Sequence, residues 1–216
     1  MRTGRPRSFC VDQAADRAMN VFWRKGYEGA SLSDLTAAIG INAPSLYAAF
    51  GSKEGLFRAV LERYDARRKG FMEKVLGAPD AFGVARNYLE GIAEFAADTN
   101  GGMNPPGCLL VQSGSCGDQA IPEEVARHRA EKEAALRERF ERAREEGDLP
   151  KEADPATLAR YLAAMANGIC MQATAGASPE ELLDIARMAL ASWPVQAKTK
   201  PKKKTSSRLD SVLIDT

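Results

Sequence analysis

The chain has 216 residues, with 30 Lys and Arg, 29 Asp and Glu and one His, so its net charge of +1 excludes a uniformly basic nucleic-acid-binding surface. Four cysteines lie far apart without a CxxC pair and cannot complete a Cys/His zinc site with a single His, so we expect no metal and no cofactor. The length and the 44% hydrophobic content suffice for one or two domains with a buried core that needs no disulfide bridges.

Apolar residues recur at helical spacing along the chain, and no stretch alternates with a period of two, so the sequence predicts an all-α fold of about nine helices. Residues 1–10 are predicted to form a flexible basic arm. The first helix is predicted from Val11 to Lys25, with Gly26 as its stop. Ser31 and Asp34 then match a capping box, which begins a short second helix that ends at Gly40.

A third helix is predicted over Ala43–Phe50, with Asn42 as its N-cap and Pro44 in its first turn. The three helices make up a predicted head of residues 11–52. Two short helices joined by a tight, glycine-containing turn are typical of a helix-turn-helix, whose second helix can enter a DNA major groove. Short helical hairpins also occur in proteins that never touch DNA, so this spacing alone leaves both interpretations open.

Residues 53–195 are predicted to form a helical body, followed by a disordered Lys-rich tail over residues 196–216. A long helix from Lys53 to about Leu76 links the head to this body. Further helices are predicted at 80–97, 108–113 and 122–146. Two more begin after Asp154 and Ser178, each of which precedes a proline and can cap a helix.

The outward side chains of the third helix are small or can form hydrogen bonds, as close approach to base edges and phosphates requires. They are Asn42, Ala43, Ser45, Tyr47 and Ala48. Lys53 begins the next helix, where an ammonium group and a helix N-terminus can both meet phosphate. Arg5 and Arg7 of the arm can lie in an adjacent minor groove, although an ordinary charged terminus explains them equally well.

Four stretches carry a resemblance to a known family. They are FWRKGY at 22–27, SLSDL at 31–35, GINAPSLY at 40–47 and FGSKEGLF at 50–57. In order and spacing they resemble the N-terminal domain of the tetracycline-repressor (TetR/AcrR) family, over about residues 7–57. The resemblance implies an all-helical homodimeric repressor with a three-helix DNA-binding head, a long linking helix and a helical body that holds an inducer.

Carried over position by position, the resemblance implies DNA contacts for a set of head residues. They are Ser31, Asn42, Ala43, Ser45, Tyr47, Ala48 and Lys53. Ala48 and Ala49 replace the His and Tyr often found there, so fewer polar base contacts are available. Cys10 stands where close relatives often have an Asp N-cap, which weakens the start of the first helix.

The nearly neutral total conceals three regions of different charge. Residues 1–74 carry 13 basic and 8 acidic residues, residues 75–197 carry 11 and 19, and residues 198–216 carry 6 and 2. The basic excess of the first region coincides with the predicted DNA-binding head. The basic tail either adds nonspecific, salt-sensitive DNA affinity or only keeps the chain in solution.

No membrane partner is expected. The longest uncharged stretch, residues 161–179, is interrupted by Asn167 and Gln172, and the N-terminus lacks the apolar run of a secretory signal. We therefore expect a cytoplasmic protein.

The two helices after Asp154 and Ser178 offer small and flexible apolar residues for a symmetric four-helix interface between two copies of the chain. The candidates are Leu158, Leu162, Met165, Ile169, Ala186, Ala189 and Leu190. The alternative is that these residues form the core of a single protomer. The sequence does not identify the ligand of the body.

Cys108 is predicted near the N-terminus of a short helix, a place that lowers a thiol pKa and favours reaction with oxidants or electrophiles. The alternative is a small buried apolar residue. His128, the single histidine, is predicted to be solvated and paired with Glu124, so an enzyme that uses Cys108 lacks a base within reach.

The leading hypothesis is therefore a dimeric DNA-binding transcriptional regulator, not an enzyme: a repressor that a small-molecule inducer releases from a pseudo-palindromic operator. Its predicted partners are double-stranded operator DNA, a second copy of the chain and an unidentified effector. The alternative is a redox- or electrophile-responsive regulator, or a thiol enzyme, that uses Cys108.

Overall fold

The structure, a computed structural model, describes residues 9–99, 104–113 and 120–194. These residues form nine α-helices and no strand, which confirms the predicted all-α fold. The helices are α1 (Val11–Gly29), α2 (Leu32–Ile39), α3 (Ala43–Phe50), α4 (Lys53–Leu76), α5 (Ala81–Ala97), α6 (Leu109–Gln112), α7 (Ala120–Glu145), α8 (Pro155–Thr174) and α9 (Pro179–Ala191). Within these ranges, no helix has the length and apolar character that crossing a membrane requires. Arg5, Arg7 and the Lys-rich tail lie outside the described residues.

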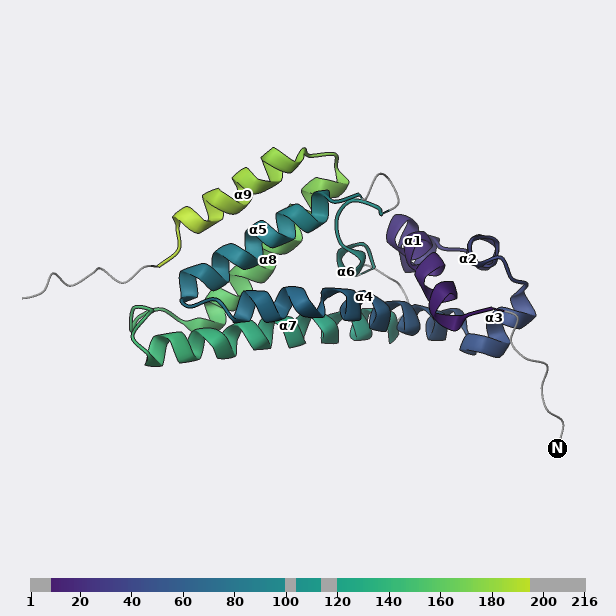
Figure 1. Cartoon of the computed structure of the whole chain (residues 1–216), viewed down its shortest axis with the longest axis horizontal. Coiled ribbons are helices and arrows are strands. Elements are labelled where there is room, and N and C mark those ends of the chain that lie inside the picture. The colour runs from purple at the N-terminus through teal and green to yellow at the C-terminus, as the bar shows by residue number, and fades with distance from the viewer. Residues whose placement is uncertain (1–8, 100–103, 114–119, 195–216) are drawn as a thin grey trace, which may run out of the picture.

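The molecule is elongated, with α1, α2 and α3 gathered at one end (Figure 1). α4 starts in this head and runs into the body alongside α7; α5 and α8 pack on these two long helices, and α9 lies outside α5 and α8 (Figure 1). α5 packs against both α8 and α9, while α7 packs against α8. α4 therefore belongs to both parts of the molecule.

Local sequence sets the ends of the head helices. Ser31 accepts a hydrogen bond from the Asp34 amide at 3.1 Å, and the Asp34 carboxylate accepts one from the Ser31 amide at 3.0 Å, which completes the predicted capping box. Gly40 ends α2 with a φ of 82°, a left-handed conformation that glycine adopts without strain. Arg17 of α1 donates to the Ile39 carbonyl at 2.9 Å. The capping box therefore fixes the start of α2, and Gly40 and the Arg17 bond fix the turn between α2 and α3.

An aromatic cluster joins α1 to α4. Phe22 and Tyr27 of α1 meet Phe57 of α4, with ring centroids 5.0 and 5.2 Å apart. Further along the same two helices, Trp23 packs edge-on against Tyr64 at 5.4 Å. Each such pair contributes about 0.5–1.5 kcal/mol beyond the burial of its area. The head is therefore held to α4 by apolar packing.

An ion pair lies between the same two helices. The Asp16 carboxylate of α1 accepts two hydrogen bonds from the Arg63 guanidinium of α4, at 2.6 and 2.7 Å, and lies 2.9 Å from Arg67. The hydrogen bonds from Arg63, helped by the charge of Arg67, lower the pKa of Asp16. Because a bidentate pair fixes orientation as well as distance, α1 cannot rotate on α4 without breaking it.

Two predicted helix boundaries differ from the structure by more than one residue. Gly26 ends the regular part of α1 with a φ of 68° and a ψ of 174°, but a further turn continues to Gly29. α7 begins at Ala120 rather than Pro122, because a proline fits the first turn, where its missing N–H has no helical partner to lose. The N-caps predicted at Asp154 and Ser178 are confirmed.

Gly107 brings the loop before α6 against α8. Its amide donates to the Ala96 carbonyl of α5 at 2.9 Å, and its φ is 87°. A Cβ at this position would lie 2.8 Å from the Cys170 carbonyl oxygen and would also clash with the Thr174 hydroxyl. A residue without a side chain is therefore needed for this close approach.

We predict that Gly107→Ala lowers the free energy of unfolding by about 2 to 4 kcal/mol, because a left-handed alanine costs roughly 1 kcal/mol and the clash with α8 adds about 1 to 3 kcal/mol. The matched control is Gly147→Ala, since Gly147 has a φ of 80° and a Cβ there would meet no atom within 4 Å. Urea unfolding followed by circular dichroism measures both. Equal losses in the two variants would contradict the close approach of the loop to α8.

Candidate nucleic-acid interface and body cavity

α3 turns an apolar side chain inward and small or polar ones outward. Leu46 is fully buried, whereas Asn42, Tyr47 and Ala48 are exposed, Tyr47 with 48% of its surface. Ala43 and Ser45, the other two residues predicted to face outward, are half-buried. The structure therefore brings these predicted contact residues together on one short helix at the end of the molecule (Figure 1).

Ser31 and Asn42, two of the predicted DNA-contact residues, already use some of their hydrogen-bonding atoms to cap helices. The Ser31 hydroxyl donates to the Asp34 carboxylate at 2.7 Å, so its proton is not available to a phosphate oxygen. The Lys25 ammonium, 2.7 Å away, and the Ser31 hydroxyl and amide lower the pKa of Asp34 to about 2. The Asn42 Oδ1 accepts the Ser45 amide at 2.9 Å, which leaves the Asn42 Nδ2 as a donor.

Lys53, the first residue of α4, lies at the edge of the same surface. Its ammonium nitrogen is 4.4 Å from the centre of the Tyr27 ring, a cation–π contact. Among the salt bridges of the described residues, none uses Lys53. The ring thus holds an uncompensated cation at the positive N-terminal end of a helix, where a phosphate binds favourably.

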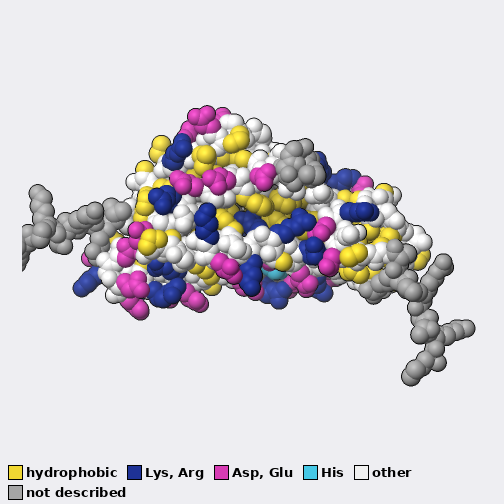
Figure 2. All heavy atoms as spheres, in the orientation of Figure 1, with side chains coloured by type: hydrophobic (Ala, Val, Ile, Leu, Met, Phe, Trp, Pro, Cys, Tyr) yellow, Lys and Arg dark blue, Asp and Glu magenta, His cyan; other side chains and the backbone are white. Residues whose placement is uncertain are grey.

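The body contains a cavity of about 140 Å³ that side chains of α4, α5, α6, α7 and α8 enclose. Its apolar lining consists of Phe71, Met72, Tyr88, Ile92, Leu110, Val111, Ala163 and Ala166. Its polar lining consists of Arg68, Cys108, Arg129, Lys132, Glu133, Asn167 and Cys170. Figure 2 shows apolar side chains at the floor of a recess beside α6, with Lys and Arg side chains around it. Cavities of this composition bind small molecules.

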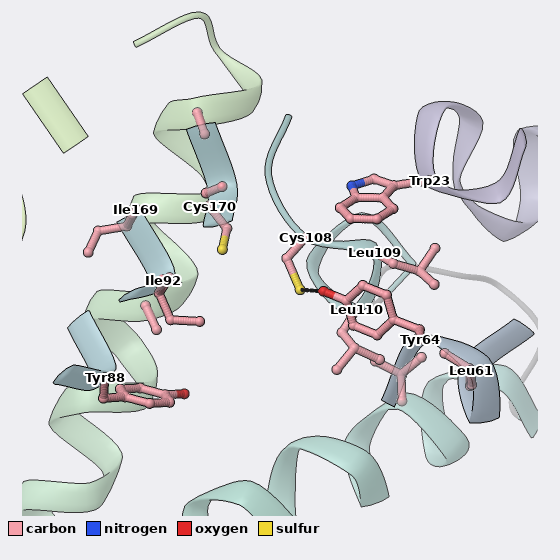
Figure 3. Close-up of a cluster of buried hydrophobic side chains, with 14 of the residues drawn as sticks. Trp23, Leu61, Tyr64, Tyr88, Ile92, Cys108, Leu109, Leu110, Ile169 and Cys170 are labelled. Atoms are coloured by element: carbon pink, nitrogen blue, oxygen red, sulfur yellow. Dashed lines mark hydrogen bonds between the residues drawn. The ribbon is translucent and has the colours of Figure 1, made fainter. Parts of the chain in front are cut away.

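Cys108 is the N-cap of α6 and points toward Tyr64, with Cys170 of α8 across the same space (Figure 3). The Cys108 sulfur lies 3.0 Å from the Tyr64 hydroxyl, which accepts a hydrogen bond from Arg68 at 2.9 Å. A hydrogen bond from Cys170, the charge of Arg68 and the Tyr64 hydroxyl lower the pKa of Cys108 well below its usual value. The pKa of Cys170 is raised because it donates that hydrogen bond. Cys108 is itself buried, which opposes ionisation, and a reagent reaches its sulfur only through the cavity that it lines.

The wall of the cavity also touches the head. α6 packs against α1, and the Gln112 carbonyl oxygen lies 3.2 Å from the point that a Cβ of Gly26 would occupy. Trp23 of α1 packs on Tyr64, whose hydroxyl contacts Cys108. A displacement of residues in the cavity wall is therefore transmitted to α1 in two ways, by the packing of α6 on α1 and by the contact of Tyr64 with Trp23.

The candidate dimer residues divide by their burial within one chain. Five are buried in the protomer: Leu162, Ile169, Ala186, Ala189 and Leu190. Leu158 and Met165 are partly buried against the same core. Exposed apolar surface on α8 and α9 lies instead at Met171, with 63% of its surface exposed, and at Met188, with 75%. The five buried side chains belong to the core of the single protomer.

The expectation of a solvated His128 is wrong. Its Nδ1 contacts the Asp65 carboxylate of α4, and only 13% of its side chain is exposed. The predicted partner Glu124 lies further away, at 3.7 Å, while Lys132 also bonds Asp65, at 2.8 Å. Sequence reasoning missed Asp65 as a partner because it lies on another helix, and no spacing signal links the two positions.

The chain resembles proteins of known class. The family described as "Bacterial regulatory proteins, tetR family" matches residues 15–60. Over 198 residues the chain is 36% identical to the HTH-type transcriptional repressor ComR of Escherichia coli strain K12, an alignment that covers 88% of this chain and 92% of that protein. Over 61 residues, 28% of this chain and 31% of the relative, it is 52% identical to the HTH-type transcriptional repressor BdcR of the same strain.

A solved structure of similar sequence has the same fold and belongs to the same family. A cysteine mutant of the TetR family transcriptional regulator CifR, in complex with 26-base-pair double-strand operator DNA, has a TM-score of 0.82 and 40% identity to this chain. The alignment covers 88% of this chain and 100% of that one. The family model, the similarity to ComR over most of the chain and the shared fold all point to one family. The chain belongs to the TetR family of bacterial transcriptional regulators.

Proposed function

We propose that the chain is a cytoplasmic transcriptional repressor that binds a pseudo-palindromic operator as a homodimer and leaves it when a small molecule enters the body cavity. The observation that carries this proposal is the exposed, capped surface of α3 in a chain whose relative CifR binds operator DNA. The similarity to the repressor ComR over most of the chain favours repression over activation.

On this proposal, the residues of the head, the arm and the start of α4 have different roles at the DNA. Asn42, Ser45 and Tyr47 supply hydrogen bonds to bases or phosphates, and Lys53 supplies a cation for a phosphate. The small side chains of Ala43 and Ala48 allow close approach, and Ser31 supports the surface by capping α2. Arg5 and Arg7 reach the adjacent minor groove.

A symmetric dimer requires an exposed face that is complementary to itself. α8 and α9 offer such a face in Met171 and Met188, together with Ala164 and Gly168, which are exposed and small enough for close helix packing. Pairing through this face would hold two heads at a fixed separation. A fixed separation matches an operator with two half-sites about one helical turn apart.

The effector acts through the helices that the cavity and the head share. A ligand among the side chains of α4 and α6 changes the packing of these two helices against α1. The separation of the two heads then changes, and operator affinity falls. By linkage, DNA must weaken the binding of this ligand by the same factor.

A second candidate function is chemical sensing through Cys108, and the contact of its sulfur with Tyr64 favours it. A thiolate there reacts with oxidants or electrophiles at a point that touches both the cavity and α6. Because the relatives are transcriptional regulators, we assign this thiol to sensing rather than to catalysis.

We predict that Asn42→Asp keeps the helix cap of α3 but weakens its contact with DNA. Aspartate caps a helix as well as asparagine does, so thermal stability is unchanged. The variant loses an amide donor and places a negative charge against the DNA backbone, so affinity for the operator beside its own gene falls by about tenfold or more. Asn42→Ala loses the donor and also about 1 kcal/mol of stability. Fluorescence anisotropy and thermal unfolding measure the two effects.

Asn87→Asp on α5 is the matched control, since it makes the same chemical change outside the head. We expect its operator affinity to equal that of the unsubstituted chain. Operator binding by Asn42→Asp that is as tight as that of the control would refute the assignment of α3 as the DNA-contacting helix.

We predict that Tyr64→Phe raises the pKa of Cys108, because it removes the hydroxyl that contacts the sulfur and joins it to Arg68. Alkylation by iodoacetamide, followed by mass spectrometry across a pH series, should then reach half its maximal rate at a higher pH than in the unsubstituted chain. The exposed Cys10 serves as the reference thiol in the same sample. A Cys108 that reacts no faster than Cys10 at neutral pH in the unsubstituted chain would end the sensing proposal.

A further inference from the structure

The cavity that we propose for the effector carries an unbalanced positive charge. Lys132 is paired with Asp65 at 2.8 Å, and Glu133 is paired with Arg160 at 3.3 Å, so these two lining charges already have partners. The other two charged lining residues are Arg68 and Arg129, and within the described part of the chain neither forms an ion pair with a carboxylate.

Arg68 is surrounded by aromatic rings rather than by anions. Its guanidinium carbon lies 4.0 Å from the centre of the Phe95 ring and 5.3 Å from that of Phe71. One hydrogen bond, to the Tyr64 hydroxyl at 2.9 Å, engages only part of a group that carries five donors. A guanidinium held in this way retains donors for another acceptor.

Arg129 provides an independent sign of a missing partner. One of its terminal nitrogens donates to the Leu110 carbonyl at 2.6 Å, but its Nε is buried and has no hydrogen-bond partner among the described residues. Buried donors are nearly always paired in native proteins, so this donor at the cavity wall is open to an acceptor that enters the cavity. A thiolate at Cys108 could balance the charge of Arg68, but the Arg129 Nε would still lack an acceptor.

The remaining lining sets the size and nature of the rest of the ligand. Phe71, Met72, Tyr88, Ile92 and Leu110 present apolar surface to the same space. The volume of about 140 Å³ is close to that of an apolar cavity of roughly 150 Å³ that holds one benzene molecule. The apolar body of the ligand is therefore about the size of one ring.

We propose that the effector is a small carboxylic acid, with an apolar body of about one ring among these side chains and its carboxylate bound by Arg68 and Arg129. A planar guanidinium matches the two oxygens of a carboxylate, and a charged acceptor forms stronger hydrogen bonds than a neutral one. This inference rests on the proposal that the cavity holds the effector, and it specifies the chemical class of that ligand.

Calorimetric titration of the full chain with benzoate, benzamide and benzylamine at neutral pH tests the charge requirement. These probes share one ring and differ in charge. We expect benzoate to bind, benzamide to bind at least about tenfold more weakly, and benzylamine to show no binding, because a lost charge-assisted hydrogen bond costs about a factor of ten or more. Benzamide binding as tight as benzoate binding, or no binding of benzoate, would overturn the inference.

Arg129→Gln tests the residue, with Arg137→Gln as the control on the exposed side of the same helix. Arg129→Gln should weaken benzoate binding about tenfold or more and leave benzamide binding unchanged, whereas Arg137→Gln should change neither. Equal weakening of both probes by Arg129→Gln would mean a merely structural role and would overturn the assignment. If Arg129→Gln does not fold, Arg68→Lys gives the same test, since it keeps the charge and loses the planar fork.

Operator binding on the same samples separates this inference from the proposed function. A chain that binds operator DNA but does not prefer benzoate over benzamide contradicts the ligand class alone. A chain that prefers benzoate but binds no operator contradicts the DNA-binding proposal alone.

Discussion

The contact between α1 and α4 is the constraint on which the rest of the structure depends. Phe22 and Phe57 bury their rings against each other, and beside them Asp16 and Arg63 form a two-point ion pair. α2 packs on α1, and α3 packs on α4, so the orientation of the helix-turn-helix follows from this single contact. α4 has 24 residues and continues from the head into the body. A shift of its body half therefore also moves the head helices that pack on it.

The body combines an ordinary apolar core with one region that a core alone would not need. Side chains such as Leu89, Phe140 and Ile169 are fully buried and carry the stability of the helical stack. Beside them, the buried Cys108 and the partly buried Arg68 and Arg129 line a cavity, and desolvating a cation without an anionic partner is costly. Polar groups of this kind reduce stability, and their presence beside α6 and α4 supports the proposal that the body receives a ligand.

Sequence reasoning predicts the head well because its signals are local. Ser31 with Asp34, Asn42 and Gly40 each act on residues within three or four positions, and every one of them ends or begins a helix as predicted. The cavity could not be predicted, since Tyr64, Cys108 and Arg129 meet only after the helices pack. The dimer face stays a prediction for a related reason: an apolar stripe does not reveal whether Leu162 covers its own chain or a second one.

The most direct test of the account is a titration of the full chain into DNA from the region upstream of its own gene, with unrelated DNA in excess and the stoichiometry measured by mass photometry. The account predicts saturable binding that survives the competitor, two chains or a multiple of two on each operator duplex, and an affinity that falls steeply with salt because phosphates are neutralised. Binding that the unrelated DNA abolishes, or a single chain on each duplex, would contradict it.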